Sequence, residues 1–215
     1  MAKSRAPRNT LSLERVITEG AALADEKGIE SLTIRALAER LGVQPMALYH
    51  HVANKDALLD ALVDVVNAEV YSPVVGRPWR DELAERSRSM RSALRSHPWA
   101  LSLMETRAHP GPRTVAGHEA VLAVLAAAGF APRQIGDAYA VLDAFVYGFA
   151  LQESMLANVG LGTATEELAA GMDLTAAPHL ADFASRASAD DYAFGDSFEV
   201  GLDIVLEGIQ RLTKC

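Results

Sequence analysis

The chain has 215 residues, of which half are hydrophobic and 22% are charged, and its formal net charge at pH 7 is -8. This length can bury a sizeable core in one domain or two, and no apolar run approaches the length needed to span a bilayer. The single cysteine, Cys215, excludes an internal disulfide framework and any zinc site built from cysteines.

The first twelve residues, MAKSRAPRNTLS, contain Lys3, Arg5 and Arg8 with no apolar segment behind them. We therefore expect no secretion signal, no membrane partner and a cytoplasmic protein. Two interpretations of this basic arm stay open, because it can follow DNA phosphates or a minor groove, or be a solubilising tail. Residues 1–72 hold eight Lys or Arg against ten Asp or Glu, so most of the net negative charge lies beyond them.

Apolar residues recur at helical spacing from Leu13 to about Lys27, which predicts an amphipathic first helix with Ser12 as its cap and Gly28 as its end. A second, short helix is predicted to begin after Thr33 and to end at Gly42. Pro45 suits the first turn of a third helix, which is expected to run to about His51. Two short helices joined by a tight turn that contains glycine predict a helix-turn-helix.

The third helix leaves polar and aromatic side chains to be explained. Val43 and Leu48 have the spacing of core residues, whereas Tyr49, His50 and His51 fall on other faces. A tyrosine hydroxyl and two imidazoles can bind phosphate oxygens or base edges, and Lys55 adds a positive charge. In the plainer interpretation, Tyr49 packs over the turn and the histidines are only solvated.

A further helix, capped by Asn54, is predicted from about Asp56 to Tyr71, and the segment 72–78, with two prolines and a glycine, then breaks the helical pattern. We place the domain boundary here, with residues 1–72 as one domain and residues 73–215 as the other. Beyond it the spacing predicts helices over residues 79–96, 98–105, 114–128, 132–156 and 194–212. Residues 160–191 are mixed in composition and are expected to be the least ordered stretch. No strand-like alternation is present, so the expected fold is all-α.

The motifs GIESLT, IRALAERLGV, LYHHV and NKDALL, between Gly28 and Leu59, closely resemble the DNA-binding domain of TetR-type transcriptional repressors. The resemblance covers about residues 10 to 72. It implies that a set of residues on and beside the third helix lies at or near DNA, and we add Gln44 to this set: Thr33, Arg35, Gln44, Pro45, Met46, Ala47, Tyr49, His50, His51 and Lys55.

Residues 73–215 resemble the ligand-binding and dimerisation domain of the tetracycline repressor subgroup. The resemblance rests on such stretches as SALRSH, YGFAL, FGDSFEVGL and the closing LTKC. In that subgroup the helices matching 138–156 and 194–212 form a four-helix bundle between two subunits, which implies a homodimer here. The alternative is a monomer in which these two helices simply have wide apolar faces.

The ligand chemistry departs from the tetracycline repressor. The positions that bind metal and drug there match Leu103, Gln152, Ala144 and Val121, and neither leucine, alanine nor valine can bind a divalent ion. We therefore expect no magnesium–tetracycline, no metal and no cofactor.

The expected effector is a hydrophobic small molecule, since most of the residues at the matching positions are apolar. The predicted effector-binding residues are Arg86, Met90, Trp99, Leu103, Met104, Arg107, Val121, Leu125, Phe145, Phe149 and Gln152. About half of these are equally explained as plain core residues.

No catalytic motif is present, so we expect no enzyme. The sequence favours a ligand-responsive transcriptional regulator, most simply a repressor that binds palindromic operator DNA as a homodimer. Two alternatives stay open: a drug-sequestering protein without specific DNA function, and an activator or corepressor-dependent regulator of the same fold.

Overall fold

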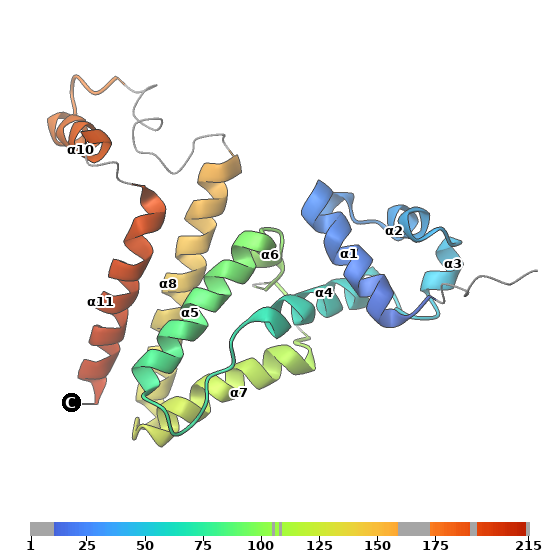
Figure 1. The fold of residues 1–215 in the computed structure, drawn as a ribbon, viewed down its shortest axis with the longest axis horizontal. Coiled ribbons are helices and arrows are strands. Elements are labelled where there is room, and N and C mark those ends of the chain that lie inside the picture. The colour runs from blue at the N-terminus through green and yellow to red at the C-terminus, as the bar shows by residue number, and fades with distance from the viewer. Residues whose placement is uncertain (1–10, 105, 108, 159–172, 190–192, 214–215) are drawn as a thin grey trace, which may run out of the picture. The chain divides into compact units, whose positions relative to one another are not determined.

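The computed structural model describes residues 11–104, 106–107, 109–158, 173–189 and 193–213 (Figure 1). Helices account for the regular structure throughout these residues, and no strand is found among them, which confirms the all-α prediction. The chain folds into two compact units. The first unit comprises residues 1–68 and 96–115, and the second unit comprises residues 69–95 and 116–215.

The first unit contains α1 (Leu13–Lys27), a short 3-10 turn (Ile29–Ser31), α2 (Ile34–Leu41), α3 (Pro45–Leu48), α4 (Lys55–Glu69, up to residue 68) and α6 (Ala100–Met104). Ser12 caps α1, since its hydroxyl accepts a hydrogen bond from the Arg15 N–H, and Gly28 ends the helix at φ 79°. The core is fully buried and aliphatic: Val16, Leu32, Leu37, Leu48, Leu58, Leu62 and Val66.

Gly20 of α1 packs beside leucine side chains of α4 and α2. A Cβ at this position would lie 3.4 Å from Leu62, with Leu58 and Leu37 next nearest. On the outer side, Arg40 of α2 donates to Glu19 and to Glu26 of α1, at 2.8 and 2.7 Å. The hydrogen bond from Arg40 lowers the pKa of the Glu26 carboxyl. The first two helices are thus fixed to each other by packing and by charge.

Residues 96–115 belong to the first unit although the chain on both sides of them belongs to the second unit. Asp25 of α1 accepts a hydrogen bond from Trp99 Nε1 at 2.6 Å, and His97 Nδ1 lies 2.8 Å from the same oxygen. Arg107 donates to Asp60 of α4 at 2.6 Å. Polar contacts therefore hold this segment, which we call the inserted segment, against α1 and α4.

The second unit contains α5 (Trp79–Ser96, up to residue 95), α7 (Pro112–Ala127, from residue 116), α8 (Pro132–Asn158), α10 (Pro178–Ala189), a 3-10 turn (Phe194–Asp196) and α11 (Ser197–Leu212). Figure 1 shows α8 and α11 running alongside each other. They pack closely because Gly201 faces the Phe145 ring, where a Cβ would lie 2.6 Å from the nearest ring carbon.

A largely buried ion pair joins helices of the second unit. Arg91 of α5 donates to both oxygens of Glu153 of α8, at 2.9 and 2.6 Å, and to Gly195 O at 3.0 Å. Its guanidinium also lies over the Phe198 ring, 4.4 Å from the centroid, and 5.2 Å from that of Phe149. One side chain thus joins α5, α8 and the start of α11.

Two helix ends predicted from the sequence need correction. The helix that begins at Pro45 ends at Leu48 rather than His51, because residues 49–51 form a turn in which the His51 and Val52 N–H groups both donate to Leu48 O. The helix that follows ends at Glu69, two residues before Tyr71. Within residues 160–191, the stretch expected to be least ordered, residues 178–189 form α10, while residues 160–172 and 190–191 lie outside the described residues. The basic arm at Lys3, Arg5 and Arg8 also lies outside them.

Candidate functional site

The turn between α2 and α3 fixes the orientation of the short α3. Thr33 caps α2 by accepting a hydrogen bond from the Ala36 N–H at 3.0 Å. Gly42 ends α2 in the left-handed region at φ 69°, where residues with a side chain are strained. The only buried residue of α3 is Leu48, which is fully buried, and Val52 follows at 5% exposure. Leu48 and Val52 therefore pack into the core, and most of the remaining surface of α3 faces solvent.

The predicted DNA-binding residues lie largely on the surface. Met46 is 70% exposed and Tyr49 is 46% exposed, which is unusual for large side chains with much apolar surface. The other exposed members of the set are Thr33, Arg35, Gln44, Pro45, His50 and Lys55, whereas Ala47 and His51 are half-buried. The plainer interpretation, that Tyr49 packs over the turn, explains only part of its surface. The structure places a mixed apolar, aromatic and basic surface on and around α3.

The predicted effector-binding residues divide between the two units. Trp99, Leu103, Met104 and Arg107 belong to the first unit, in the inserted segment. Trp99 is 7% exposed and Arg107 is bound to Asp60 and Asp56, so both have structural contacts there. Leu103 and Met104 are half-buried.

In the second unit, three predicted residues meet at one small cavity. Arg86, Met90 and Val121 line it together with Ser87, Tyr139, Leu142, Asp143 and Val146, and its free volume is about 10 Å³. Leu125 and Phe149 instead lie in the main apolar core, where Phe149 stacks on Phe194 with ring centroids 4.5 Å apart. Phe145 packs against Phe198 and Gly201, and Gln152 is exposed. The predicted set therefore does not form one site within this unit.

The polar residues that line this cavity on α8 were not predicted from the sequence. Tyr139 and Asp143 are one turn apart on α8, and His118 of α7 meets the Tyr139 ring edge-on at 5.7 Å. Burial, and then the Asp143 charge, raise the pKa of the Tyr139 hydroxyl, so it stays protonated at neutral pH. Burial lowers the pKa of His118, which favours its neutral form. The positions 139, 142, 143 and 146 share a helix face, and this spacing is the signal that could have found them.

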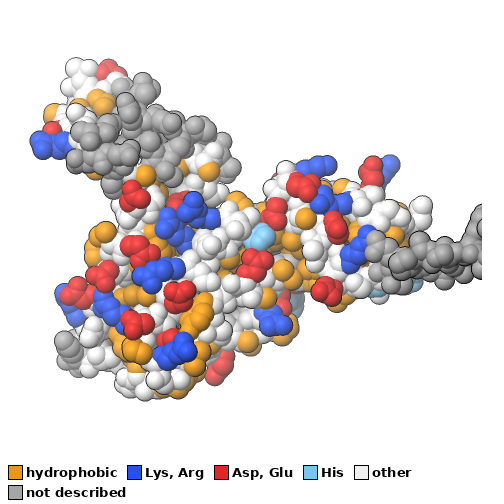
Figure 2. Space-filling model, in the orientation of Figure 1, with side chains coloured by type: hydrophobic (Ala, Val, Ile, Leu, Met, Phe, Trp, Pro, Cys, Tyr) orange, Lys and Arg blue, Asp and Glu red, His pale blue; other side chains and the backbone are white. Residues whose placement is uncertain are grey.

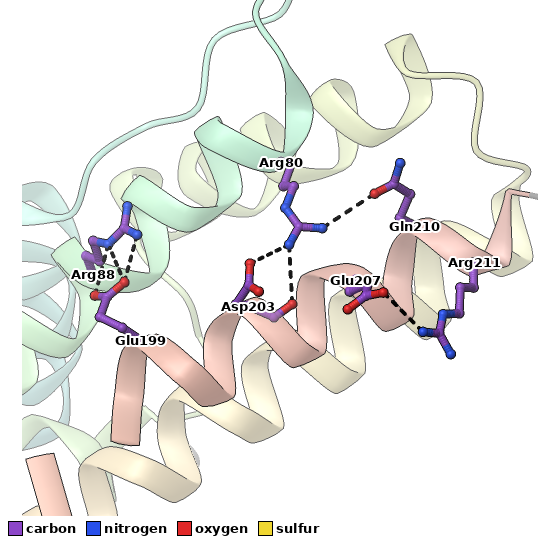
Figure 3. Close-up of polar contacts among 7 residues, drawn as sticks. All are labelled: Arg80, Arg88, Glu199, Asp203, Glu207, Gln210 and Arg211. Carbon is purple, nitrogen blue, oxygen red and sulfur yellow. Dashed lines mark hydrogen bonds and ion pairs between the residues drawn. The ribbon is translucent and has the colours of Figure 1, made fainter. Parts of the chain in front are cut away.

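A larger, open groove of about 730 Å³ lies along α5 and α11. Figure 3 shows Arg80 reaching Asp203 and Gln210, and Arg88 meeting Glu199. The hydrogen bond from Arg88 lowers the pKa of the Glu199 carboxyl. Figure 2 shows acidic and basic side chains alternating on this face of the second unit. These charged side chains of α5 and α11 pair with one another. The groove is therefore better explained as a solvent-exposed contact between the two helices than as a ligand site.

Large apolar side chains lie exposed on α8 and α11. They are Val141, Leu151 and Met155 of α8 and Val200 and Ile204 of α11, each at least 50% exposed. The opposite face of α11, with Phe198, Leu202, Leu206 and Ile209, is buried in the core. Both faces of this helix are therefore apolar, which a solvated monomer does not require.

Comparison with known proteins identifies the family. Residues 16–62 match the tetR family of bacterial regulatory proteins, and residues 72–213 match the family of tetracyclin repressor-like C-terminal domains. The chain belongs to the TetR family. Its first unit carries the helix-turn-helix of this family of transcription regulators, as the motifs between Gly28 and Leu59 had predicted.

Two relatives and one solved structure are similar to most of this chain. The tetracycline repressor protein class A from transposon 1721 in Escherichia coli is 34% identical over 91% of this chain and 89% of its own. A transcriptional regulator of Saccharopolyspora erythraea is 38% identical over 67% of this chain, but the match covers only 62% of that regulator. The crystal structure of ActR from Streptomyces coelicolor in complex with actinorhodin has 26% identity and a TM-score of 0.76, covering 94% of this chain and 98% of ActR.

No helix in the described part of the TetR-family chain has the length and apolar character needed to cross a bilayer.

Proposed function

We propose that this TetR-family chain is a cytoplasmic repressor, which binds palindromic operator DNA as a homodimer and is released by an apolar small molecule. The observation that carries the proposal is the surface of α3. Leu48 and Val52 hold this region in place, so that α3 presents Met46 to solvent and the turn after it presents Tyr49 and His50, beside Lys55. Such a surface can place aromatic and imidazole groups against phosphates and base edges in a major groove.

A single α3 is too short to recognise an operator, because four helical residues reach only a few base pairs. Two copies about 34 Å apart would reach successive major grooves of a palindrome. The exposed apolar side chains of α8 and α11 supply a surface on which two copies can pair. This pairing would remove Val200 and Ile204, each 64% exposed, from water.

The effector part of the proposal rests on the cavity between α5, α7 and α8. Its walls are mainly apolar, with Met90, Val121, Leu142 and Val146. ActR is described in complex with actinorhodin, so a relative of the same fold binds a small organic molecule. Magnesium–tetracycline is not proposed here, because Leu103, Val121 and Ala144 offer no ligand for a metal ion.

The inserted segment is a covalent connection between the second unit, which contains the cavity, and the first unit, which contains α3 and α4. The chain leaves α5, forms contacts with α1 and α4 in the first unit, and returns to α7. A ligand that fits better after α5 and α7 have shifted would therefore pull on α4 through residues 96–115. Clearing the operator requires that the ligand favour the released state by several kcal/mol, on the order of 5.

Two alternatives predict different behaviour. A drug-sequestering protein would bind small molecules and show no specific affinity for DNA, and the exposed surface of α3 argues against it. An activator or corepressor-dependent regulator would share the architecture but bind its operator more tightly with ligand.

Fluorescence anisotropy with a labelled duplex from the region beside the chain's own gene tests the proposal. We expect Tyr49→Ala to weaken specific binding about five- to tenfold or more, with ligand affinity unchanged. Phe183→Ala removes another half-exposed aromatic ring, on α10, and serves as the matched control. Absence of any specific complex, or equal loss of DNA and ligand affinity in Tyr49→Ala, would contradict the proposal.

A further inference from the structure

Met46 is the most exposed large apolar side chain among the described residues. It is 70% exposed, whereas Val200 and Ile204, which come next, are 64% exposed. Successive residues of an α-helix are about 100° apart around its axis, so Met46 lies about 160° from the fully buried Leu48. The side chain of Met46 is therefore on the side of α3 opposite to the core.

The surface around Met46 carries no formal charge. Residues 41–54 contain no Asp, Glu, Lys or Arg. Exposed basic side chains lie on both sides of this stretch in the sequence, at Arg35 and Lys55. Such cations bind backbone phosphates, which fix the position of a protein on the duplex but carry no sequence information. The uncharged residues of α3 and its surroundings are then left to contact base edges.

The lack of charge at α3 narrows the bases that this surface can select. The commonest specific contact to guanine is a bidentate pair from Arg or Lys to O6 and N7, and cytosine N4 donates to Glu or Asp. None of these residue types occurs in residues 41–54. Thymine instead presents an apolar C5-methyl group in the major groove, and an apolar side chain is its matching partner. The base pairs that suit Met46 are therefore A·T pairs.

Gln44 adds a hydrogen-bonding group that suits the same base pair. It is the N-cap residue of α3, it is exposed, and its side chain makes no capping hydrogen bond. Adenine presents the N7 acceptor beside the N6 donor, and a side-chain amide has a donor and an acceptor to match them. The first residues of a recognition helix are those that meet base edges. Tyr49 and His50, which follow α3, are then left to bind phosphates.

We infer that the operator of this protein places A·T pairs under α3, with the Met46 side chain against the C5-methyl group of a thymine. Gln44 would form two hydrogen bonds to an adenine in the same or an adjacent base pair. The spacing allows this, because residues two positions apart are about 3 Å apart along a helix axis and base pairs are about 3.4 Å apart. The inference rests on the proposed function, in which α3 lies in the major groove of operator DNA.

Deoxyuridine tests the thymine contact, because it lacks only the C5-methyl group and pairs as thymine does. The full-length protein first selects its preferred duplex from a random pool. Each thymine of that duplex is then replaced by deoxyuridine, at the symmetric positions of both half-sites, and binding is measured by fluorescence anisotropy at one salt concentration. We expect one replacement to weaken binding about fourfold in each half-site, hence about fifteenfold in both, which is the effect of one buried methyl group.

Substitutions of Met46 assign the methyl contact to its side chain. Met46→Ala should lose the sensitivity, so that the deoxyuridine duplex binds within about twofold of the thymine duplex. Met46→Leu keeps an apolar side chain of similar volume and should retain the sensitivity. Leu180→Ala shortens another exposed aliphatic side chain, on α10, and is the matched control that should behave as the unaltered protein. Circular dichroism checks that each variant folds.

The base analogue 7-deazaadenine tests the adenine contact in the same way, because it lacks only the N7 acceptor. Its introduction at the contacted adenine should weaken binding about fivefold in each half-site, the effect of one lost hydrogen bond. In Gln44→Ala the same replacement should change affinity by less than about twofold. A 7-deazaadenine effect that persists in Gln44→Ala would overturn the adenine contact.

A selected duplex without A·T pairs in its enriched half-sites, or one in which no deoxyuridine replacement weakens binding, would overturn the inference. A methyl effect that persists in Met46→Ala would also overturn it, and loss of that effect in Tyr49→Ala would assign the contact to the tyrosine. Each of these results requires specific DNA binding and leaves the proposed repressor function standing. Failure to enrich any sequence would overturn the proposed function, and the inference with it.

Discussion

Replacing Arg107 with Met should loosen the inserted segment from α4. Arg107 donates through Nε to Asp60 at 2.6 Å and through Nη1 to Asp56 at 3.2 Å. The hydrogen bonds that Arg107 donates to Asp60 and, to a lesser extent, to Asp56 raise the pKa of its guanidinium, so both carboxylates favour its charged form. Met keeps an unbranched apolar stem of similar reach, so the substitution removes the charge-assisted bonds and little packing.

The expected loss of stability follows from the exposure of the two acceptors. The Asp60 side chain is 22% exposed, so its charge-assisted hydrogen bond is worth about 1.5–3 kcal/mol. The Asp56 side chain is 77% exposed, and solvent screening reduces its share to about 0–1 kcal/mol. We therefore expect Arg107→Met to lower the free energy of unfolding of the first unit by about 2–3 kcal/mol.

The two tryptophans allow this unit to be followed alone. Trp99 lies in the first unit and Trp79 in the second, so urea unfolding in a Trp79→Phe background reports on the first unit through Trp99 fluorescence. Arg113→Met, at an exposed position of the inserted segment, is the control. A loss below about 0.5 kcal/mol, or losses from Arg107→Met and Asp60→Asn that simply add, would refute the reasoning.

Three further outcomes are expected. Arg91→Met should cost the second unit about 3–5 kcal/mol in urea unfolding, because Glu153 is left buried without its partner, and adding Glu153→Leu should restore most of the loss. Ile204→Glu should make the protein monomeric in analytical ultracentrifugation and abolish specific operator binding, since two carboxylates would face each other across the paired surface. Unfolding free energy should fall between pH 7 and pH 5, and His118→Phe should remove part of that fall.

The direction of the last effect follows from the lowered pKa of His118. As the pH drops below its ordinary pKa near 6.5, the unfolded chain binds a proton more readily than the folded one, so stability is lost. An identical pH dependence in His118→Phe would contradict this assignment. A dimer that survives Ile204→Glu, or an Arg91→Met/Glu153→Leu protein as unstable as Arg91→Met, would contradict the other two.

The local elements were well predicted because their signals are local. Ser12, Thr33 and Asn54 cap α1, α2 and α4 as the sequence indicated, and Gly28 and Gly42 end the first two helices. Each of these depends on residues within one turn of the chain. The shortness of α3 was not predictable in this way, because the turn at residues 49–51 is set by the burial of Leu48 and Val52 against other helices.

The cavity was predicted less well because periodicity shows only which residues face inward. Leu125 and Val121 are both buried on α7, yet of the two only Val121 lines the small cavity. Whether space remains depends on side chains from other helices, here Tyr139 and Leu142. The roles of Trp99 and Arg107 were likewise hidden, since their partners Asp25 and Asp60 are 74 and 47 residues away in sequence.

The inserted segment also affects how the parts of this protein can be exchanged with those of its relatives. A hybrid made by joining residues 1–72 to another regulator's remaining sequence would lose His97, Trp99 and Arg107, and with them the partners of Asp25 and Asp60. The donor domain would then depend on foreign side chains to bind its acidic residues. A hybrid that is intended to keep this DNA specificity should therefore include residues 96–115 together with the helix-turn-helix.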